Sequence, residues 1–209
     1  MTLALNLAKA LPDLATAAML YAVWENAAAY DIEWVRAAIF TLLLEFFVLH
    51  AGGFMAVTVF DPQATRRVRM LRLAGWSAGY LLFISAFAKA FDAWWMLGAF
   101  AWFCFAKVQA IYTGAPPTER DRFHAMLSWA LGVLAFLGSI FLTIDGPLPE
   151  LGVTAEVRAA AGFGEGGVWE KEPHRALAGA VLYFSVMGLL RPILGLLFAP
   201  RDEISSQAN

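Results

Sequence analysis

Long apolar stretches separated by short polar segments make up most of this chain. A helix needs about 20 predominantly apolar residues to cross the hydrocarbon core of a bilayer. Six stretches approach that length, at about 14–30, 34–60, 71–91, 94–112, 124–144 and 174–199. No stretch alternates as a membrane strand does, and a helix satisfies its own backbone in lipid. The pattern predicts an all-α integral membrane helical bundle of six transmembrane helices, forming one domain over residues 1–209, with Asp13 as the N-cap of the first helix.

The segment 145–173 is the one sizeable connection between these predicted helices. It carries apolar residues that a solvated linker does not need, among them Val153, Val157 and Phe163. Glycines follow between Gly162 and Gly167 and give it a hinge. We expect this segment to fold back over the outer end of the bundle as a lid outside the cytoplasm, with a disordered connection as the alternative.

Composition narrows the class of protein further. Hydrophobic residues make up 60% of the chain and charged residues 15%, whereas soluble chains carry about 25% charged residues. The net charge of −2 and the lack of a clustered basic face exclude a nucleic-acid partner. The single cysteine, Cys104, can form no internal disulfide and supplies no cysteine-based metal cluster. The lipid bilayer is the expected partner, and a homo- or hetero-oligomer within the membrane stays open.

Positive charges indicate the orientation, because cytoplasmic loops of membrane proteins are enriched in Lys and Arg. The loop after the second predicted helix contains four arginines, and the loop after the fourth contains Arg120 and Arg122. Placing both loops in the cytoplasm puts ten of the fifteen Lys and Arg residues there, together with both termini. The acidic 145–173 connection then lies on the opposite side of the membrane.

Small and aromatic residues recur at helical spacing. Gly75 and Gly79 form a G-x-x-x-G pattern, and Gly52-Gly53 lies inside the second predicted helix. Small residues let helix backbones approach closely, so packing within this bundle is favoured over a dimer seam. The stripe Trp94, Gly98 and Trp102 is likewise interpreted as helix packing ahead of a cofactor platform.

Ionisable side chains inside a membrane helix are costly, so each is a candidate functional residue. At about 1.5 Å per residue, Glu45 lies about 16 Å below Trp34, close to the midplane. It is expected to be a neutral acid, to pair with Lys107 or Arg191, or to face a wet cavity. His50 lies about 24 Å below Trp34, and a structural hydrogen bond is the favoured interpretation, because an isolated E-x4-H spacing is not a metal motif.

A second group of polar residues falls near the predicted outer end. Glu25 and Asn26 lie in the first helix, with Glu25 about 9 Å below its outer end. Glu172 and His174 flank the start of the sixth helix. A metal would need Glu25, Glu172 and His174 to converge, and the favoured interpretation is that no metal binds. The sequence names no other cofactor.

Two short elements resemble a known family. Tyr21-Ala-Val-Trp24-Glu25-Asn26 resembles a Y/W-E-N element, and the segment 46–54 (FFVLHAGGF) resembles an F-F-x-x-H-x-G-x-F element. Both are similar to elements of a domain-of-unknown-function family of small bacterial multi-helix inner-membrane proteins. The resemblance implies that Glu25, Asn26 and His50 belong to the family's polar signature and that the chain lies in a bacterial inner (plasma) membrane. It implies no activity.

Three functions from different classes fit the sequence. The first is a small transporter or channel-like protein for protons, cations or a small solute, using Glu25, Glu45 and His50 at descending depths. The second is an accessory or structural subunit that binds another membrane protein or a hydrophobic cofactor. The third is a membrane enzyme at the outer face. No nucleophile or zinc motif supports an enzyme, so it is disfavoured and no catalytic residue is assigned.

Overall fold

The computed structural model describes residue 8, residues 10–164 and residues 166–197. In this part of the chain the protein is helical and contains no strand. The elements are α2 (Leu11–Glu25), η1 (Ala27–Ala29), α3 (Ile32–Val59), α4 (Arg66–Ala90), α5 (Trp95–Thr113), α6 (Glu119–Ile144), α7 (Ala155–Ala160), α8 (Val168–Lys171) and α9 (Pro173–Leu197). Five of them, α3, α4, α5, α6 and α9, contain segments long and apolar enough to cross a bilayer. The chain is therefore a multi-pass helical membrane protein.

The first predicted helix differs from its expected form. Helix α2 has 15 residues, which corresponds to about 22 Å, whereas the hydrocarbon core is about 30 Å thick. The predicted N-cap is wrong: Ala10 occupies that position, and Asp13 is already inside the helix. The helix ends at Glu25 with Asn26 as its C-cap residue, in accord with the preference of Asn for helix ends. The count of six spans stays a prediction, and both termini lie outside the described residues.

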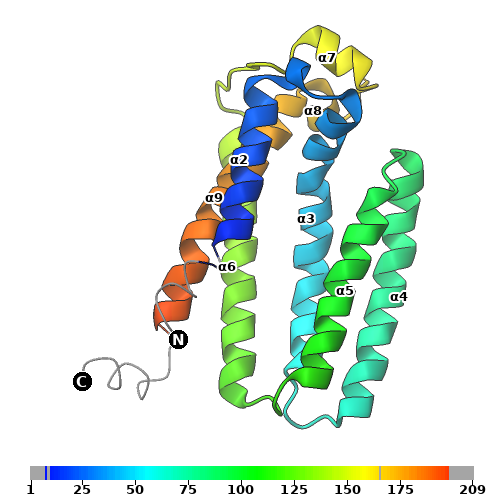
Figure 1. Ribbon diagram of the computed structural model, residues 1–209, viewed down its shortest axis with the longest axis vertical. Coiled ribbons are helices and arrows are strands. Elements are labelled where there is room, and N and C mark those ends of the chain that lie inside the picture. Colours follow the sequence, from blue (N-terminus) through cyan, green and yellow to red (C-terminus); the bar gives the residue numbers. More distant parts are fainter. Residues whose placement is uncertain (1–7, 9, 165, 198–209) are drawn as a thin grey trace. The chain divides into compact units, whose positions relative to one another are not determined.

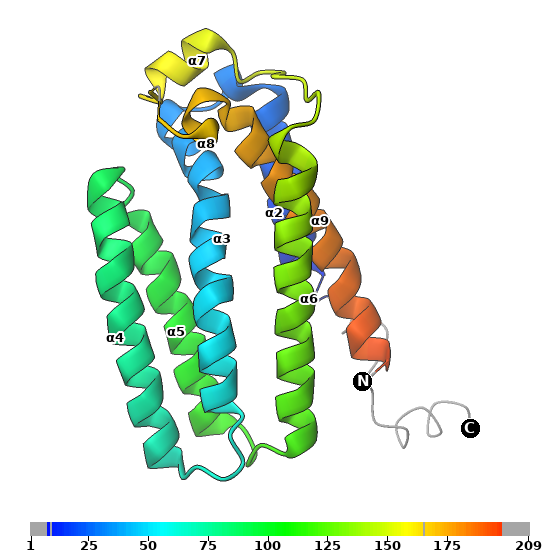
Figure 2. The same cartoon turned by 180° about the vertical axis from the view of Figure 1, so that it is seen from behind.

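The chain divides into two compact units, which are described separately. The first consists of residues 1–42 and 134–209, and the second of residues 43–133. In the first unit, α2 runs antiparallel to α9, as Figures 1 and 2 show. A Cβ on Gly188 of α9 would lie 2.6 Å from Leu14 Cδ2 and 3.4 Å from the Leu14 backbone N, so the two helices approach closely here. The core includes Leu20, Leu177 and Tyr183.

The second unit contains the α4–α5 hairpin and the adjoining parts of α3 and α6. Trp129 of α6 donates its indole N–H to the carbonyl of Leu49 at 2.8 Å. A Cβ on Gly53 would lie 2.7 Å from Trp129 Cε2, and a Cβ on Gly52 would lie 3.9 Å from Phe103 Cζ. The prediction that small residues let α3 pack closely is confirmed at Gly53, whereas a Cβ at Gly52 would make only an ordinary contact.

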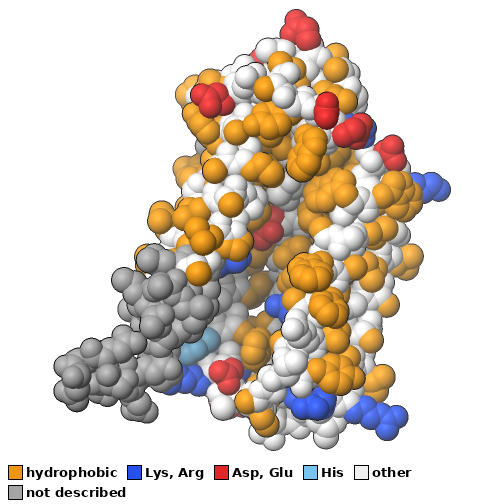
Figure 3. Space-filling view, in the orientation of Figure 1, with side chains coloured by type: hydrophobic (Ala, Val, Ile, Leu, Met, Phe, Trp, Pro, Cys, Tyr) orange, Lys and Arg blue, Asp and Glu red, His pale blue; other side chains and the backbone are white. Residues whose placement is uncertain are grey.

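The other small-residue predictions are wrong. A Cβ on Gly75, Gly79 or Gly98 would meet nothing within 4 Å, and Trp102 is 71% exposed. These positions face away from the neighbours that the described chain supplies. Figure 3 shows hydrophobic side chains over the outward faces of the helices, where lipid can replace a protein neighbour.

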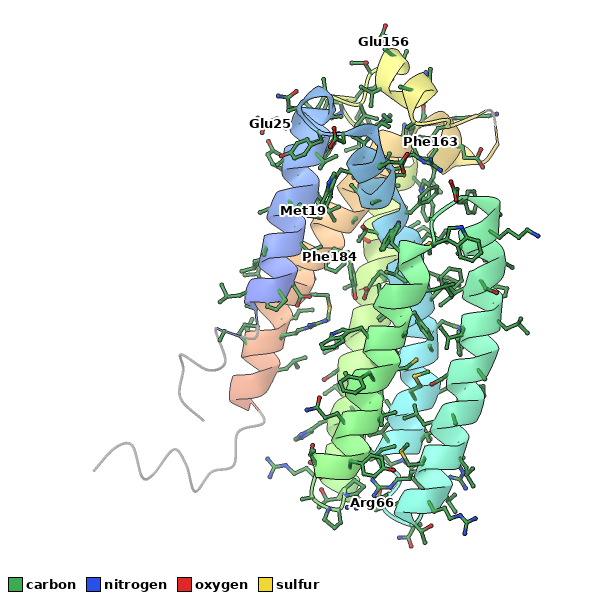
Figure 4. All side chains as sticks on the ribbon, turned by 45° about the vertical axis from the view of Figure 1, so that its right-hand side comes forward. Met19, Glu25, Arg66, Glu156, Phe163 and Phe184 are labelled. Atoms are coloured by element: carbon green, nitrogen blue, oxygen red, sulfur yellow. The ribbon has the colours of Figure 1, made fainter. Side chains whose placement is uncertain are left out.

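The 145–173 connection packs against the ends of α2 and α3. Gly152 donates its N–H to the Trp24 carbonyl at 2.9 Å, and the Trp24 indole donates to the Pro149 carbonyl at 3.2 Å. The Phe163 ring lies 5.7 Å from the Phe40 ring, and Val153 is buried. Helices α7 and α8 form within the connection, with Glu156 on α7 pointing outward in Figure 4. These contacts confirm that the connection folds back, and its role as a lid stays a prediction.

Candidate functional site

The residues predicted at the outer end do not converge. Glu25 and Asn26 are exposed at the end of α2, where Glu25 is the last helical residue and does not lie about 9 Å below the helix end as expected. His174 is 3% exposed at the start of α9, whereas Glu172 precedes that helix and is half-buried. Among the described residues, no group of three or more His, Cys, Asp and Glu side chains could hold a metal ion. Glu25, Glu172 and His174 therefore do not form a metal site in this structure.

Glu172 instead forms part of an anchor. Arg175 forms an ion pair with Glu172 and donates to the carbonyls of Thr143 and Gly146 at 3.0 and 2.9 Å. The hydrogen bond from Arg175 holds the pKa of Glu172 below its usual value. Because helix-end carbonyls lack intrahelical partners, the guanidinium satisfies the end of α6 and ties it to α9. Glu172 therefore has a structural role, as the ion-pair partner of Arg175.

Arg191 has a partner that sequence reasoning did not name. Its Nε lies 3.0 Å from Oδ2 of Asp13 on α2, and the Asp13 side chain is 6% exposed. Within the described residues this oxygen accepts no hydrogen bond, so the contact is an ion pair without hydrogen-bond geometry. Lys107 and Arg191 are the two cations predicted as partners for Glu45. Arg191 instead pairs with Asp13.

The remaining charged candidates lie in the second unit. Glu45 is half-buried on α3, and the prediction that it faces the bundle interior and not lipid stays a prediction. Lys107 is half-buried on α5, with its ammonium 4.9 Å from the centroid of the Phe103 ring. This distance is within the range of a cation–π contact, which offsets part of the cost of a cation in an apolar helix.

His50 is held by a residue on the next helix. The hydroxyl of Tyr80 on α4 lies 2.7 Å from His50 Nδ1, within range of a strong hydrogen bond. In the part of the chain that the structure describes, this is the one hydrogen bond of either side chain. The favoured interpretation of His50, a structural hydrogen bond, is confirmed for Nδ1. The residue is nonetheless exposed, and Nε2 has no partner among the described residues.

Aromatic rings surround this pair and form a continuous exposed surface. The ring of Phe46 stacks on the His50 ring at 5.9 Å, and the ring of Phe54 meets His50 edge-on at 5.6 Å. Trp76 then stacks on Phe54 at 4.6 Å. Phe46, Phe54 and Trp76 are all exposed. We call the surface formed by Phe46, His50, Phe54, Trp76 and Tyr80 the His50 face.

The position of the His50 face along α3 can be measured from the polar end of the second unit. His50 precedes Val59, the last residue of α3, by nine residues, which corresponds to about 14 Å. At that end Arg69 donates to the Val59 carbonyl at 2.9 Å, and Arg72 forms an ion pair with Asp61 at 2.9 Å. Figure 4 shows Arg66 at the same end of α4. His50 therefore lies within the predicted span, nearer the Val59 end of α3 than the Trp34 end.

Sequence reasoning missed Trp76 and Tyr80 as members of this surface. The signal was present, because Phe46, His50 and Phe54 recur at intervals of four and lie on one helical face. Trp76 and Tyr80 have the same spacing on the next helix. Which face of α4 meets α3 was not readable from the spacing.

The fold defines a multi-pass helical membrane protein, and its second unit carries an exposed imidazole on an aromatic surface. Comparisons of the chain with protein-family models, with curated proteins and with solved structures find no match.

Proposed function

We propose that the chain is an accessory membrane protein that binds a hydrophobic ligand on the His50 face. The observation that supports this function is an exposed imidazole whose Nδ1 is bonded to Tyr80 and whose Nε2 has no partner among the described residues. An unpaired polar group costs free energy in hydrocarbon, where no water replaces the missing hydrogen bond. A ligand that pairs with Nε2 would remove this cost.

The surrounding rings suit the same function. Phe46, Phe54 and Trp76 present exposed aromatic surface beside the imidazole. Ligand sites are mostly apolar, with a small number of polar groups that fix the orientation of the ligand. The His50 face has this composition, and it adjoins the lipid through which a hydrophobic ligand would arrive.

Glu45 supports a second candidate function, the movement of protons or cations. A half-buried carboxylate in a membrane span can take up and release a proton. Charge movement across liposomes that is lost in Glu45→Gln would support this function.

For the topology we propose six spans, with α2 as the first, both termini in the cytoplasm and the 145–173 connection outside, in a bacterial inner membrane. Support comes from the arginines at the start of α4, which are costly to translocate. A Cys104→Ala chain with a single cysteine at Gly166 should react only with an outside label, and one with a cysteine at Gln63 only with an inside label.

Ligand binding is tested by comparing what co-purifies with three forms of the chain. Wild type, His50→Phe and Trp102→Phe are extracted with their surrounding lipid, and the lipid-soluble compounds are identified by mass spectrometry. His50→Phe removes both ring nitrogens and keeps an aromatic side chain, whereas Trp102→Phe alters an exposed aromatic outside the His50 face. We expect a compound retained by wild type and Trp102→Phe and depleted in His50→Phe. The same compounds in all three would overturn the proposal.

A further inference from the structure

We propose that the ligand of the His50 face belongs to the quinone class, a flat ring with carbonyl oxygens and an apolar tail. This inference rests on the proposed function and specifies its ligand. It depends on three features of the described residues: the hydrogen bond between His50 and Tyr80, the exposed rings on either side, and the position of the imidazole within the predicted span.

The direction of the hydrogen bond between His50 and Tyr80 determines whether Nε2 is a donor or an acceptor. If the Tyr80 hydroxyl donates to Nδ1, the neutral ring carries its proton on Nε2 and this N–H stays unpaired. If Nδ1–H donates to the Tyr80 oxygen instead, the hydroxyl proton and the Nε2 lone pair have no partner among the described residues. Each arrangement leaves one donor and one acceptor unpaired, because the Tyr80 oxygen accepts no hydrogen bond from the described residues in the first. The first arrangement is favoured because it joins the more acidic donor, the phenol hydroxyl, to the more basic acceptor, the imidazole nitrogen. Nε2 is therefore an N–H donor.

An N–H donor at Nε2 requires a ligand with a hydrogen-bond acceptor. An Nε2–H group cannot coordinate a metal ion, so the neutral ring held in this way disfavours a metal tetrapyrrole. A carbonyl oxygen is the acceptor that a lipid-soluble molecule most simply offers. In a quinone the carbonyl is attached directly to a flat ring, so one hydrogen bond also fixes the plane of the ligand.

The rings beside His50 fit a flat ligand. Phe46 lies nearly parallel to the imidazole, with an interplanar angle of 13°, and Phe54 and Trp76 stack at 27°. Aromatic rings favour offset stacking, so exposed Phe46 and Trp76 offer surfaces to a ligand ring bonded at Nε2. Lipid ester carbonyls also accept hydrogen bonds, but they lie at the edge of the hydrocarbon layer and bring no ring. Because these carbonyls bring no ring, the aromatic surfaces beside His50 favour a ligand with a flat ring.

Direct binding of decylubiquinone tests this assignment. Wild type, His50→Phe, Tyr80→Phe and Trp102→Phe are placed in phosphatidylcholine nanodiscs, and bound quinone is measured above the amount in empty nanodiscs. Loss of one hydrogen bond should weaken binding by about tenfold in His50→Phe. The affinity of Tyr80→Phe should be intermediate. In this variant His50 keeps Nε2, but Nδ1 loses the hydroxyl that fixes the proton on Nε2. Trp102→Phe should bind as wild type does.

A second ligand keeps the test independent of how well the variants fold. The dimethyl ether of the reduced quinone keeps the ring and tail but has no carbonyl oxygen. It should bind wild type about tenfold more weakly than decylubiquinone, and equally well to wild type and His50→Phe. Equal quinone binding to wild type and His50→Phe would overturn the assignment, as would tighter binding of the ether. If a His50-dependent compound without a quinone ring co-purifies, the quinone assignment fails and the proposed function stands.

Discussion

The carboxylate of Asp13 on α2 and the guanidinium of Arg191 on α9 form an ion pair, with Oδ2 and Nε 3.0 Å apart. The two partners differ in environment: the Asp13 side chain is 6% exposed and the Arg191 side chain is 46% exposed. This difference makes the pair asymmetric in its contribution to stability, because only one of the two charges stays buried when its partner is removed.

Removal of Arg191 should therefore cost more than removal of the Asp13 charge. Arg191→Met leaves a buried carboxylate without its cation and should lower the free energy of unfolding by about 2–3 kcal/mol. Asp13→Asn leaves a half-exposed arginine that can reach the polar interface, and should cost about 1 kcal/mol or less. Denaturant titration in detergent measures both, with Arg67→Met as the control for an exposed arginine on α4. Equal losses would contradict the asymmetry.

Gly53 should be the most sensitive glycine of α3. An alanine Cβ there would lie 2.7 Å from Trp129 Cε2, and the indole cannot move without losing its 2.8 Å bond to the Leu49 carbonyl. Gly53→Ala should destabilise the protein by about 1–3 kcal/mol, as overpacking does. Gly98→Ala, where the new methyl group meets nothing within 4 Å, should be neutral or stabilising by up to about 1 kcal/mol. Thermal unfolding of both variants in one detergent is the comparison, and a stable Gly53→Ala would refute the close approach.

Gly152 should control the docking of the 145–173 connection. A Cβ there would lie 2.5 Å from the backbone N of Ala27 and 2.9 Å from the carbonyl O of Glu25, and backbone atoms cannot turn aside. Gly152→Ala should undock the connection and speed tryptic cutting at Arg158 and Lys171 by about tenfold, which corresponds to about 1.4 kcal/mol of lost docking. Gly167→Ala is the matched control, because its Cβ would meet nothing within 4 Å. Similar cutting rates in the two variants would mean that Gly152 does not hold the connection in place.

The anchor formed by Glu172 and Arg175 should depend on pH. The hydrogen bond from Arg175 lowers the pKa of Glu172, so its contribution to stability is present above the usual carboxyl pKa and is lost as pH falls through the lowered value. Wild type should unfold at a higher temperature than Glu172→Gln at pH 7, and the difference should shrink as the pH falls below the usual carboxyl pKa and through the lowered one. Glu119→Gln, at an exposed residue of α6, is the control. A difference that does not change between pH 7 and acidic pH would contradict this origin.

The sequence by itself determined the class of protein and most of its helices. The stretches at 34–60, 71–91, 94–112, 124–144 and 174–199 correspond to α3, α4, α5, α6 and α9, because the ability to cross a bilayer depends on the length and apolarity of one continuous segment. The folding back of 145–173 was predictable for a similar reason, since Val153 and Phe163 are apolar residues in a polar connection.

Only the tertiary structure decided which residues meet. Helical spacing places Phe46, His50 and Phe54 on one face, but it does not give the rotation of α4 that brings Tyr80 to His50. Likewise Gly53 and Gly98 look alike in sequence, and only the position of Trp129 makes one of them crowded. The sequence suggested Glu45 as a partner for Arg191, and the actual pairing with Asp13 follows from the antiparallel packing of α2 on α9. Apolarity is a property of each segment, whereas a contact requires the order, rotation and register of two segments together.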